Sequence, residues 1–354
     1  EGFALELEDE LMNFSDVSYK SFVKSESEII TLFYDKFADI PLLSRMDAVA
    51  ETFIDEIETL LNRDLPEEER IPLIEKFQKM YETMDFYVLY NRFLKKEGYQ
   101  TLPRRPLEKR KLRYEDVYPV LYLKYRLSRQ AERSNIKHLV IDEMQDYSRL
   151  QYLIIRRMFS CKMTILGDRA QTMADQQQDV LQFLPGIFGK DLRRIEMRKS
   201  YRNTVEIASY AANLIGVTDL ELFERHGMPV LERDVTDLEA ALREAVDTLF
   251  PDEKTYETAA VIVPDEKTAE RAYLILREIL AEKDFDCEKR LSWLNRDSSS
   301  FKKGLTVTTF YLAKGLEFDQ VFSIFPKDEK REIMMQAQYI AATRALHELR
   351  VYHI

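Results

Sequence analysis

The chain has 354 residues, of which 45% are hydrophobic and 32% charged, and its formal net charge is −11. This length suits two domains, and the charge excludes a protein that coats nucleic acid by charge alone. No apolar run approaches the ~20 residues of a membrane helix, and the acidic start lacks the features of a secretory signal. We therefore expect a cytoplasmic protein with no membrane segment.

Residues 1–105 are predicted to be α-helical. One helix face is indicated by apolar residues at helical spacing, namely Val49, Phe53, Ile57, Leu60 and Leu61. The sequence DLPEEER then ends that helix and begins the next, because Pro66 and acidic side chains are well tolerated in a first helical turn. We expect this region to be an insertion or arm.

Residues 101–114, TLPRRPLEKRKLRY, carry six basic residues and one acidic residue. Such charge runs are commonly solvated linkers. A contact with phosphate groups or with a partner is the alternative interpretation, and both remain open at this point.

From about residue 116, short β-rich runs alternate with helical stretches. The runs are KHLVID, KMTILGD, LRRIEM, AAVIVP, LTVTTF, QVFSIF and LRVYHI. This alternation predicts parallel sheets built from βαβ units. We expect one α/β domain over 106–190 and a second over 191–354.

The cysteines and histidines do not suggest a metal or disulfide framework. Cys161 and Cys287 are far apart, and none of the four histidines has metal-ligand spacing. We therefore expect neither a structural zinc site nor a disulfide.

Two adjacent carboxylates follow a predicted strand in the sequence HLVIDEMQDYS. Ligands of open parallel sheets bind beyond the carboxyl ends of the strands, where Asp142 and Glu143 are expected. Such a pair can hold Mg²⁺ through one acid and polarise a water for attack on a phosphoryl group through the other. An acid-capped strand end is the alternative.

Four further blocks follow in order. They are ILGDRAQTM with Gln171, SYRNTVEIA with Arg202, LAKGLEFDQVF with Lys314, Gly315 and Glu317, and YIAATRALHEL with Arg344 on a predicted helix. Planar guanidinium groups match phosphate oxygens and stabilise charge that develops during phosphoryl transfer. Five such blocks in this order are far beyond chance.

With VIDEMQDYS, these blocks resemble motifs II to VI of the UvrD/Rep-type superfamily 1 helicases. EDVYPVLYLKYRL and YLAKGLEFD are similar to the HelD branch, the helicase IV-like proteins that associate with bacterial RNA polymerase. The resemblance implies two RecA-like α/β domains with a helical insertion, and ATP and Mg²⁺ as cofactors.

The resemblance also implies roles for individual residues. Asp142 would serve Mg²⁺, Glu143 the attacking water, and Gln171 would couple the γ-phosphate to the second domain. Arg202 and Arg344 would act as arginine fingers. Glu317, beside Gly315, would contact the nucleotide. Lys314 has either a functional role or a buried structural one.

The phosphate-binding loop of such ATPases is missing from the sequence. None of the nine glycines forms G-x-x-x-x-G-K-[ST], and GIFGKD at 186–191 has the wrong spacing. We expect the chain to lack an N-terminal part and not to hydrolyse ATP alone.

The run QTMADQQQDV has no base-stacking aromatic residue. Tyr311 stands where DNA-translocating relatives commonly carry histidine, and the interval from Arg202 to Lys314 is too short for the large insertion of DNA unwinding enzymes.

The preferred hypothesis is a monomeric ATPase that remodels or recycles RNA polymerase, whose basic channel an acidic helical arm would suit. The alternatives are a DNA helicase or repair translocase on single-stranded DNA, and a catalytically dead interaction module.

Overall fold

The computed structural model describes residues 2–129, 135–168, 180–197, 199–217, 221–250, 256–283, 285–298, 303–327 and 332–354. Two compact units are present. The first comprises Glu1–Asp142, Tyr147–Leu166 and Leu181–Lys190, and the second comprises Glu143–Asp146, Gly167–Val180 and Asp191–Ile354. Gln171 and the rest of 169–179 lie outside the described residues.

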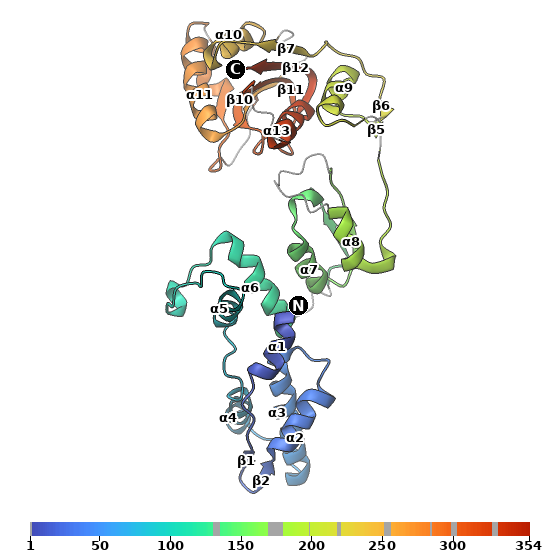
Figure 1. The fold of residues 1–354 in the computed structure, drawn as a ribbon, viewed down its shortest axis with the longest axis vertical. Coiled ribbons are helices and arrows are strands. Elements are labelled where there is room, and N and C mark those ends of the chain that lie inside the picture. The colour runs from blue at the N-terminus through green and yellow to red at the C-terminus, as the bar shows by residue number, and fades with distance from the viewer. Residues whose placement is uncertain are drawn as a thin grey trace. The chain divides into compact units, whose positions relative to one another are not determined.

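The N-terminal part of the first unit is mainly helical, as expected (Figure 1). Its helices are α1 (Gly2–Glu10), α2 (Glu26–Thr31), α3 (Arg45–Leu61), α4 (Glu67–Gln78), α5 (Phe86–Lys96) and α6 (Tyr114–Leu127). Helix α3 ends at Asn62, which takes the left-handed conformation that closes many helices, with φ 49°. Helix α4 begins after Pro66 with three glutamates, which favour the positive end of a helix dipole. A short antiparallel hairpin, β1 (Val17–Tyr19) with β2 (Phe22–Lys24), was not expected.

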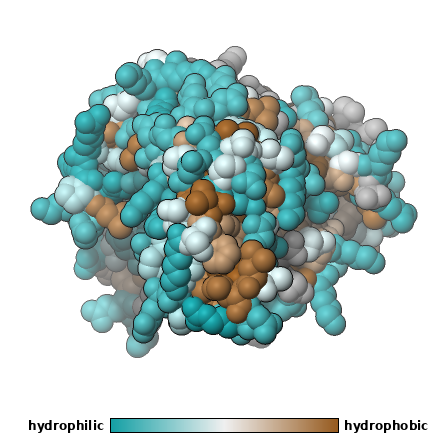
Figure 2. Space-filling model, turned by 90° about the horizontal axis from the view of Figure 1, so that it is seen from below, coloured by the Kyte–Doolittle hydropathy of each residue, from teal (hydrophilic) through white to brown (hydrophobic). Residues whose placement is uncertain are grey.

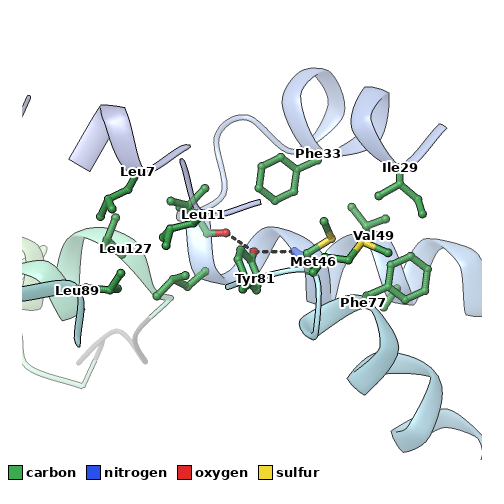
Figure 3. Close-up of a cluster of buried hydrophobic side chains, with 14 of the residues drawn as sticks. Leu7, Leu11, Ile29, Phe33, Met46, Val49, Phe77, Tyr81, Leu89 and Leu127 are labelled. Carbon is green, nitrogen blue, oxygen red and sulfur yellow. Dashed lines mark hydrogen bonds between the residues drawn. The ribbon is translucent and has the colours of Figure 1, made fainter. Parts of the chain in front are cut away.

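Apolar side chains from these helices form one core (Figure 3). Phe33, Met46 and Phe77 are fully buried in it. The Tyr81 hydroxyl donates to the Leu42 carbonyl and accepts a hydrogen bond of 3.2 Å from the Met46 N–H. Burial raises the pKa of this hydroxyl, so it stays a neutral donor. The core therefore satisfies its main internal polar group.

The first unit also contains two parallel strands. Strand β3 (His138–Ile141) pairs in register with β4 (Lys162–Ile165). Helix α7 (Arg149–Met158) connects them, and most of α8 (Val180–Phe188) belongs to the same unit. Ser148 begins α7 with a capping box that involves Gln151. This strand, helix and strand arrangement ends both strands at the same edge.

The second unit is built on a six-stranded sheet of order β7-β12-β11-β8-β10-β9. Every pairing in it is parallel. Its strands are β7 (Leu231–Asp234), β8 (Thr258–Val263), β9 (Leu291–Trp293), β10 (Gly304–Thr309), β11 (Phe318–Phe325) and β12 (Ala345–His353). A separate short pair joins β5 (Lys199–Ser200) to β6 (Glu221–Leu222). The four-residue helix α12 (Cys287–Arg290) precedes β9.

Helices cover both faces of the six-stranded sheet, as is usual for parallel sheets. Helices α10 (Leu238–Asp247) and α11 (Glu266–Ala281) pack with Val261 on one face. Helices α9 (Val205–Leu214) and α13 (Glu332–Thr343) pack with Ile262 on the other face (Figure 1). Because successive strand side chains alternate between faces, one apolar strand serves both cores.

The predicted α/β class, with parallel sheets and a helical N-terminal region, is confirmed. Two details were wrong. Leu60 is 72% exposed, because it lies off the buried face that Val49, Phe53 and Ile57 share. Residues 192–197 form no strand, and their apolar side chains Leu192, Ile195 and Met197 are exposed rather than packed in a core.

Hydrophilic side chains predominate on the face drawn in Figure 2, with apolar ones in small groups between them. Among the described residues, no helix has both the length and the apolarity to cross a membrane. Cys161 and Cys287 are free thiols.

Candidate nucleotide site

The two adjacent acids lie where the chain turns after strand β3. Asp142 follows Ile141 directly and is exposed. Glu143 has a positive φ of 52°, a conformation that costs energy for a residue with a side chain. A single 3-10 turn, Met144–Asp146, follows at once. The turn brings the acids to the carboxyl end of the strand, as predicted.

Gln145 connects this turn with the segment after β4. Its side-chain amide donates to Glu143 Oε2 at 2.5 Å, and its Oε1 accepts from the Asp168 N–H at 3.0 Å. Gly167 packs directly on the turn, because a Cβ there would lie 2.4 Å from Gln145 Oε1 and 2.6 Å from the Met144 nitrogen. The sequence alone assigned no role to Gln145. It is the residue that orients Glu143.

Lys314 lies in the β10–β11 connection and is buried against the same turn. Its Nζ donates to Asp146 Oδ1 at 2.5 Å and lies 3.6 Å from Glu143 Oε2. Only 8% of the Lys314 side chain is exposed, whereas 40% of Asp146 is, so water and salt reach the ion pair from the carboxylate side. Gly315 follows with a φ of 81°, which favours glycine. The contact gives Lys314 a structural role at the acids.

Arg202 and Glu317, both predicted site residues, form an ion pair. Arg202 Nε lies 2.7 Å from Glu317 Oε1, and both side chains are nearly half exposed. Arg202 comes between β5 and α9, and the Thr204 side chain caps α9 by accepting from the Ile207 N–H. An exposed ion pair of this kind contributes little to stability, so both groups can change partner at small cost.

Arg344 was expected on a helix. It lies instead directly after helix α13. The helix ends at Thr343 and β12 begins at Ala345, so the two elements meet without a loop. The side chain is 1% exposed, and its guanidinium donates to the Ile340 carbonyl at 3.2 Å and to Thr343 Oγ1 at 3.1 Å. The backbone therefore holds this buried cation in place.

Several charges act on Arg344 across the site. Burial lowers the pKa of its guanidinium, and the positive charge of Arg202 lowers it further, whereas Glu143 and Glu317 raise it. Three predicted site residues, Arg202, Glu143 and Glu317, thus influence the pKa of the fourth, Arg344.

Asn203 connects Arg202 to Arg344 through the backbone. Its side-chain amide donates to the Ala345 carbonyl at 2.6 Å and to the Thr343 carbonyl at 3.2 Å, on either side of Arg344. Arg225 adds a second link, because its guanidinium donates to the Leu346 carbonyl at 2.8 Å and to the Arg202 carbonyl. Neither residue was singled out from the sequence.

Two tyrosines also belong to this region. The Tyr339 hydroxyl donates to Asp168 Oδ2 at 3.0 Å, and burial raises its pKa, so it remains a donor. Tyr201, next to Arg202, is 61% exposed, and its ring lies 5.6 Å from that of Phe223. An exposed aromatic pair beside a guanidinium can stack on a nucleotide base.

The donor set suits Mg²⁺ better than a closed metal site. No group of three or more His, Cys, Asp or Glu residues suitable for a metal occurs in the described part of the chain. Mg²⁺ commonly takes one or two carboxylates and completes its shell with water and substrate phosphates. Asp142 is an exposed carboxylate of the kind that fits this mode.

Comparisons with known proteins bear on the family. Residues 7–173 match the model for the UvrD/REP helicase N-terminal domain. No curated protein matches the chain.

Among solved structures, the C-terminal domain of a possible DNA helicase from Lactobacillus plantarum WCFS1 is 24% identical, with a TM-score of 0.35, and the match covers 44% of this chain and 88% of that one. Arterivirus nonstructural protein 10, a helicase, is 14% identical, with a TM-score of 0.34 and coverage of 75% and 50%. The same helicase in complex with DNA is 13% identical, with a TM-score of 0.34 and coverage of 75% and 51%. This chain thus spans about half the length of the arterivirus helicase.

The family-model match covers residues 7–173, less than half of the chain. Its residues include the first two of the five motifs, VIDEMQDYS and ILGDRAQTM. This part of the chain is therefore similar to the N-terminal domain of UvrD/REP helicases.

Proposed function

We propose that the chain carries the acids and arginines of an ATP-hydrolysing site in a helicase-like motor. One observation carries the proposal: Arg202 lies 2.7 Å from Glu317, Lys314 lies 3.6 Å from Glu143, and Asn203, next to Arg202, is hydrogen-bonded to the backbone on either side of Arg344. Cations close to such acids suit a transition state whose negative charge grows on phosphoryl oxygens.

Each residue then has a distinct task. Asp142 would hold Mg²⁺, which would neutralise phosphate charge. Glu143, oriented by Gln145, would accept a proton from the attacking water. Arg202 would leave its pair with Glu317 to meet a phosphate, and Glu317 would then be available to the sugar. Gln171, Gly315 and Arg344 complete the proposed nucleotide contacts.

Hydrolysis also requires backbone amides and a lysine around the phosphates. The 354 residues contain no such loop. The proposal therefore concerns the natural protein in which this chain occurs, supplied with a phosphate-binding loop in addition to these residues.

Glu143→Gln in the natural protein tests the site. We expect ATP turnover to fall at least about a hundredfold, with binding of a fluorescent ATP analogue retained, because the amide keeps the shape but cannot take a proton. Glu282→Gln is the control, since that side chain is 72% exposed in another part of the unit. Unchanged turnover in Glu143→Gln would refute the role. A wild-type protein with no turnover would favour the dead interaction module.

For the coupled process, we propose remodelling or recycling of RNA polymerase in the cytoplasm, from the HelD-like motif sequences. Translocation on single-stranded DNA is the second candidate, because the family match is to helicases. ATP turnover measured with purified RNA polymerase and, separately, with single-stranded DNA distinguishes the two. Stimulation by DNA alone would overturn the preferred candidate.

A further inference from the structure

A basic segment, residues 103–113, lies between α5 and α6 and is not used by the nucleotide site. It carries six of the basic residues of a chain whose net charge is −11, and its single acid is Glu108. A solvated linker is the simplest explanation of such a run. The contacts of the segment argue against that explanation.

The start of the segment is fixed to helix α5. The Asn91 side chain accepts a hydrogen bond of 2.7 Å from the Leu102 N–H and donates one of 3.3 Å to the Leu102 carbonyl. The Tyr87 hydroxyl donates to the Pro103 carbonyl at 2.7 Å. In a free linker, the backbone would not be hydrogen-bonded to side chains of a neighbouring helix in this way.

The far part of the segment is fixed as well. Arg110 donates to Asp85 at 2.6 Å and to the Arg105 carbonyl at 3.0 Å, and its guanidinium lies 4.7 Å from the centre of the Tyr87 ring. Arg113 donates to Asp116 at 2.7 Å, and Asp116 is 1% exposed. Two of the six basic residues therefore anchor the segment.

The other four basic residues face solvent. Arg104, Arg105, Lys109 and Lys111 are exposed, and none forms an ion pair with another described residue. Because the backbone that carries them is held in place, binding a ligand would require ordering only their side chains, not the segment itself. In the sequence they form a row of four positive charges on a segment whose two ends are held by hydrogen bonds.

Exposed aromatic rings flank this row. Tyr99 precedes it and is 64% exposed, and Tyr114 follows it and is 77% exposed. The ring of Tyr118 packs edge-on against Tyr114, at 6.0 Å and 88°. The Tyr114 ring is thereby supported on one side and open to solvent elsewhere.

We propose that Tyr99, Arg104, Arg105, Lys109, Lys111 and Tyr114 form a docking surface for single-stranded nucleic acid. Backbone phosphates would meet the four cations, and bases would stack on the two tyrosines, the combination that sequence-tolerant single-strand binding uses. An acidic peptide could meet the cations, but it has no planar bases to cover the tyrosine rings. This surface does not depend on ATP hydrolysis.

Fluorescence anisotropy with the full chain tests the surface. The probes are labelled oligo-dT and oligo-rU of about 20 nucleotides, long enough for one site. Four phosphate contacts on a single strand predict that affinity falls about fiftyfold between about 50 and about 200 mM salt.

Two kinds of variant separate charge from stacking. Reversal of the four exposed cations, R104E, R105E, K109E and K111E, is expected to abolish binding. A matched control reverses four exposed basic residues elsewhere, K79E, K190E, K267E and R277E, and is expected to weaken binding only modestly. Tyr114→Ala is expected to weaken binding about tenfold, whereas Tyr114→Phe, which keeps the ring, retains it.

Some outcomes would overturn the proposal. Equal losses in the two charge-reversal variants would show that only overall charge matters. Unchanged affinity in Tyr114→Ala, together with equally tight binding of labelled poly-glutamate, would assign the surface to acidic proteins instead. No measurable binding by the wild-type chain at low salt would also refute it. Circular dichroism of each variant shows whether it is folded, and the single tyrosine substitutions decide the matter if the quadruple variant is not.

Discussion

Asn203 links the segment that carries Arg202 to the backbone around Arg344. It follows Arg202 in the chain and donates to the carbonyls on either side of Arg344. Asn203→Ala leaves those acceptors without a donor in a buried place, so we expect the free energy of unfolding to fall by about 1–3 kcal/mol. If the proposed site is right, turnover of the natural protein falls about tenfold or more as well.

Chemical denaturation and ATP turnover check both parts of the Asn203 prediction. Asn213→Ala is the control, since Asn213 is an exposed residue of helix α9. A variant with wild-type turnover and reduced stability would limit Asn203 to a structural role.

Glu206 makes the second unit sensitive to acid. A hydrogen bond with His226 and another from the Gly227 N–H lower the pKa of its carboxyl from 4.5 to about 2. A group with a lowered folded-state pKa stabilises the fold above its unfolded pKa, and this contribution is lost as pH falls toward the folded value. We therefore expect wild type and Glu206→Gln to differ in stability at pH 7 and to converge between about pH 4.5 and about 2.

The fluorescence of Trp293, which lies in the second unit, can follow denaturation at each pH. Glu282→Gln serves as the exposed control, with no such convergence expected. A difference between wild type and Glu206→Gln that stays constant down to about pH 3 would contradict the assignment.

At the scale of elements, the end of β4 and the turn after β3 fit together because residue 167 is glycine. Gly167→Ala would place a Cβ 2.4 Å from Gln145 Oε1 and 2.6 Å from the Met144 nitrogen. Because backbone must move to relieve such overlap, we expect a loss of about 1–3 kcal/mol in stability.

Gly186→Ala is the matched control. No atom lies within 4 Å of its Cβ position in α8, so it should gain about 0.5–1 kcal/mol. Thermal unfolding of both variants tests this prediction. Equal midpoints would argue against close packing of Gly167 on the turn at Met144 and Gln145.

The elements could largely be predicted because their periodicity is local. The strands around Val261 and Phe322 and the helix face of Val49 and Phe53 follow from apolar spacing alone. The β1–β2 hairpin was missed because its strands have only three residues each, with a turn at Lys20.

The candidate site could also be predicted only in part. Glu143, Arg202 and Arg344 belong to motifs in which the residue type itself indicates the chemistry. The roles of Gln145 and Asn203 could not be predicted, because they bond to backbone groups that only folding brings near. Asn203, for example, contacts a carbonyl 142 positions away. Such roles require the folded structure.

At the scale of the whole chain, the two units have separate hydrophobic cores. The core of the first includes Phe33, and the cores on the two faces of the second unit's sheet include Phe322, with no residue shared among those described. Trp293 is the only tryptophan and packs with the second unit, so its fluorescence reports that unit, whereas circular dichroism reports both. We expect Phe33→Ala and Phe322→Ala each to cost about 3–5 kcal/mol in its own unit.

In urea, Phe322→Ala should then shift the fluorescence transition to lower denaturant. Phe33→Ala should leave that transition in place and shift only part of the circular dichroism signal, because its cavity lies in the core of the first unit. The exposed substitution Leu60→Ala, also in the first unit, should shift neither by much. If Phe33→Ala moved the Trp293 transition as far as Phe322→Ala does, the chain would unfold as one cooperative body. Separate cores would then not mean separate stability.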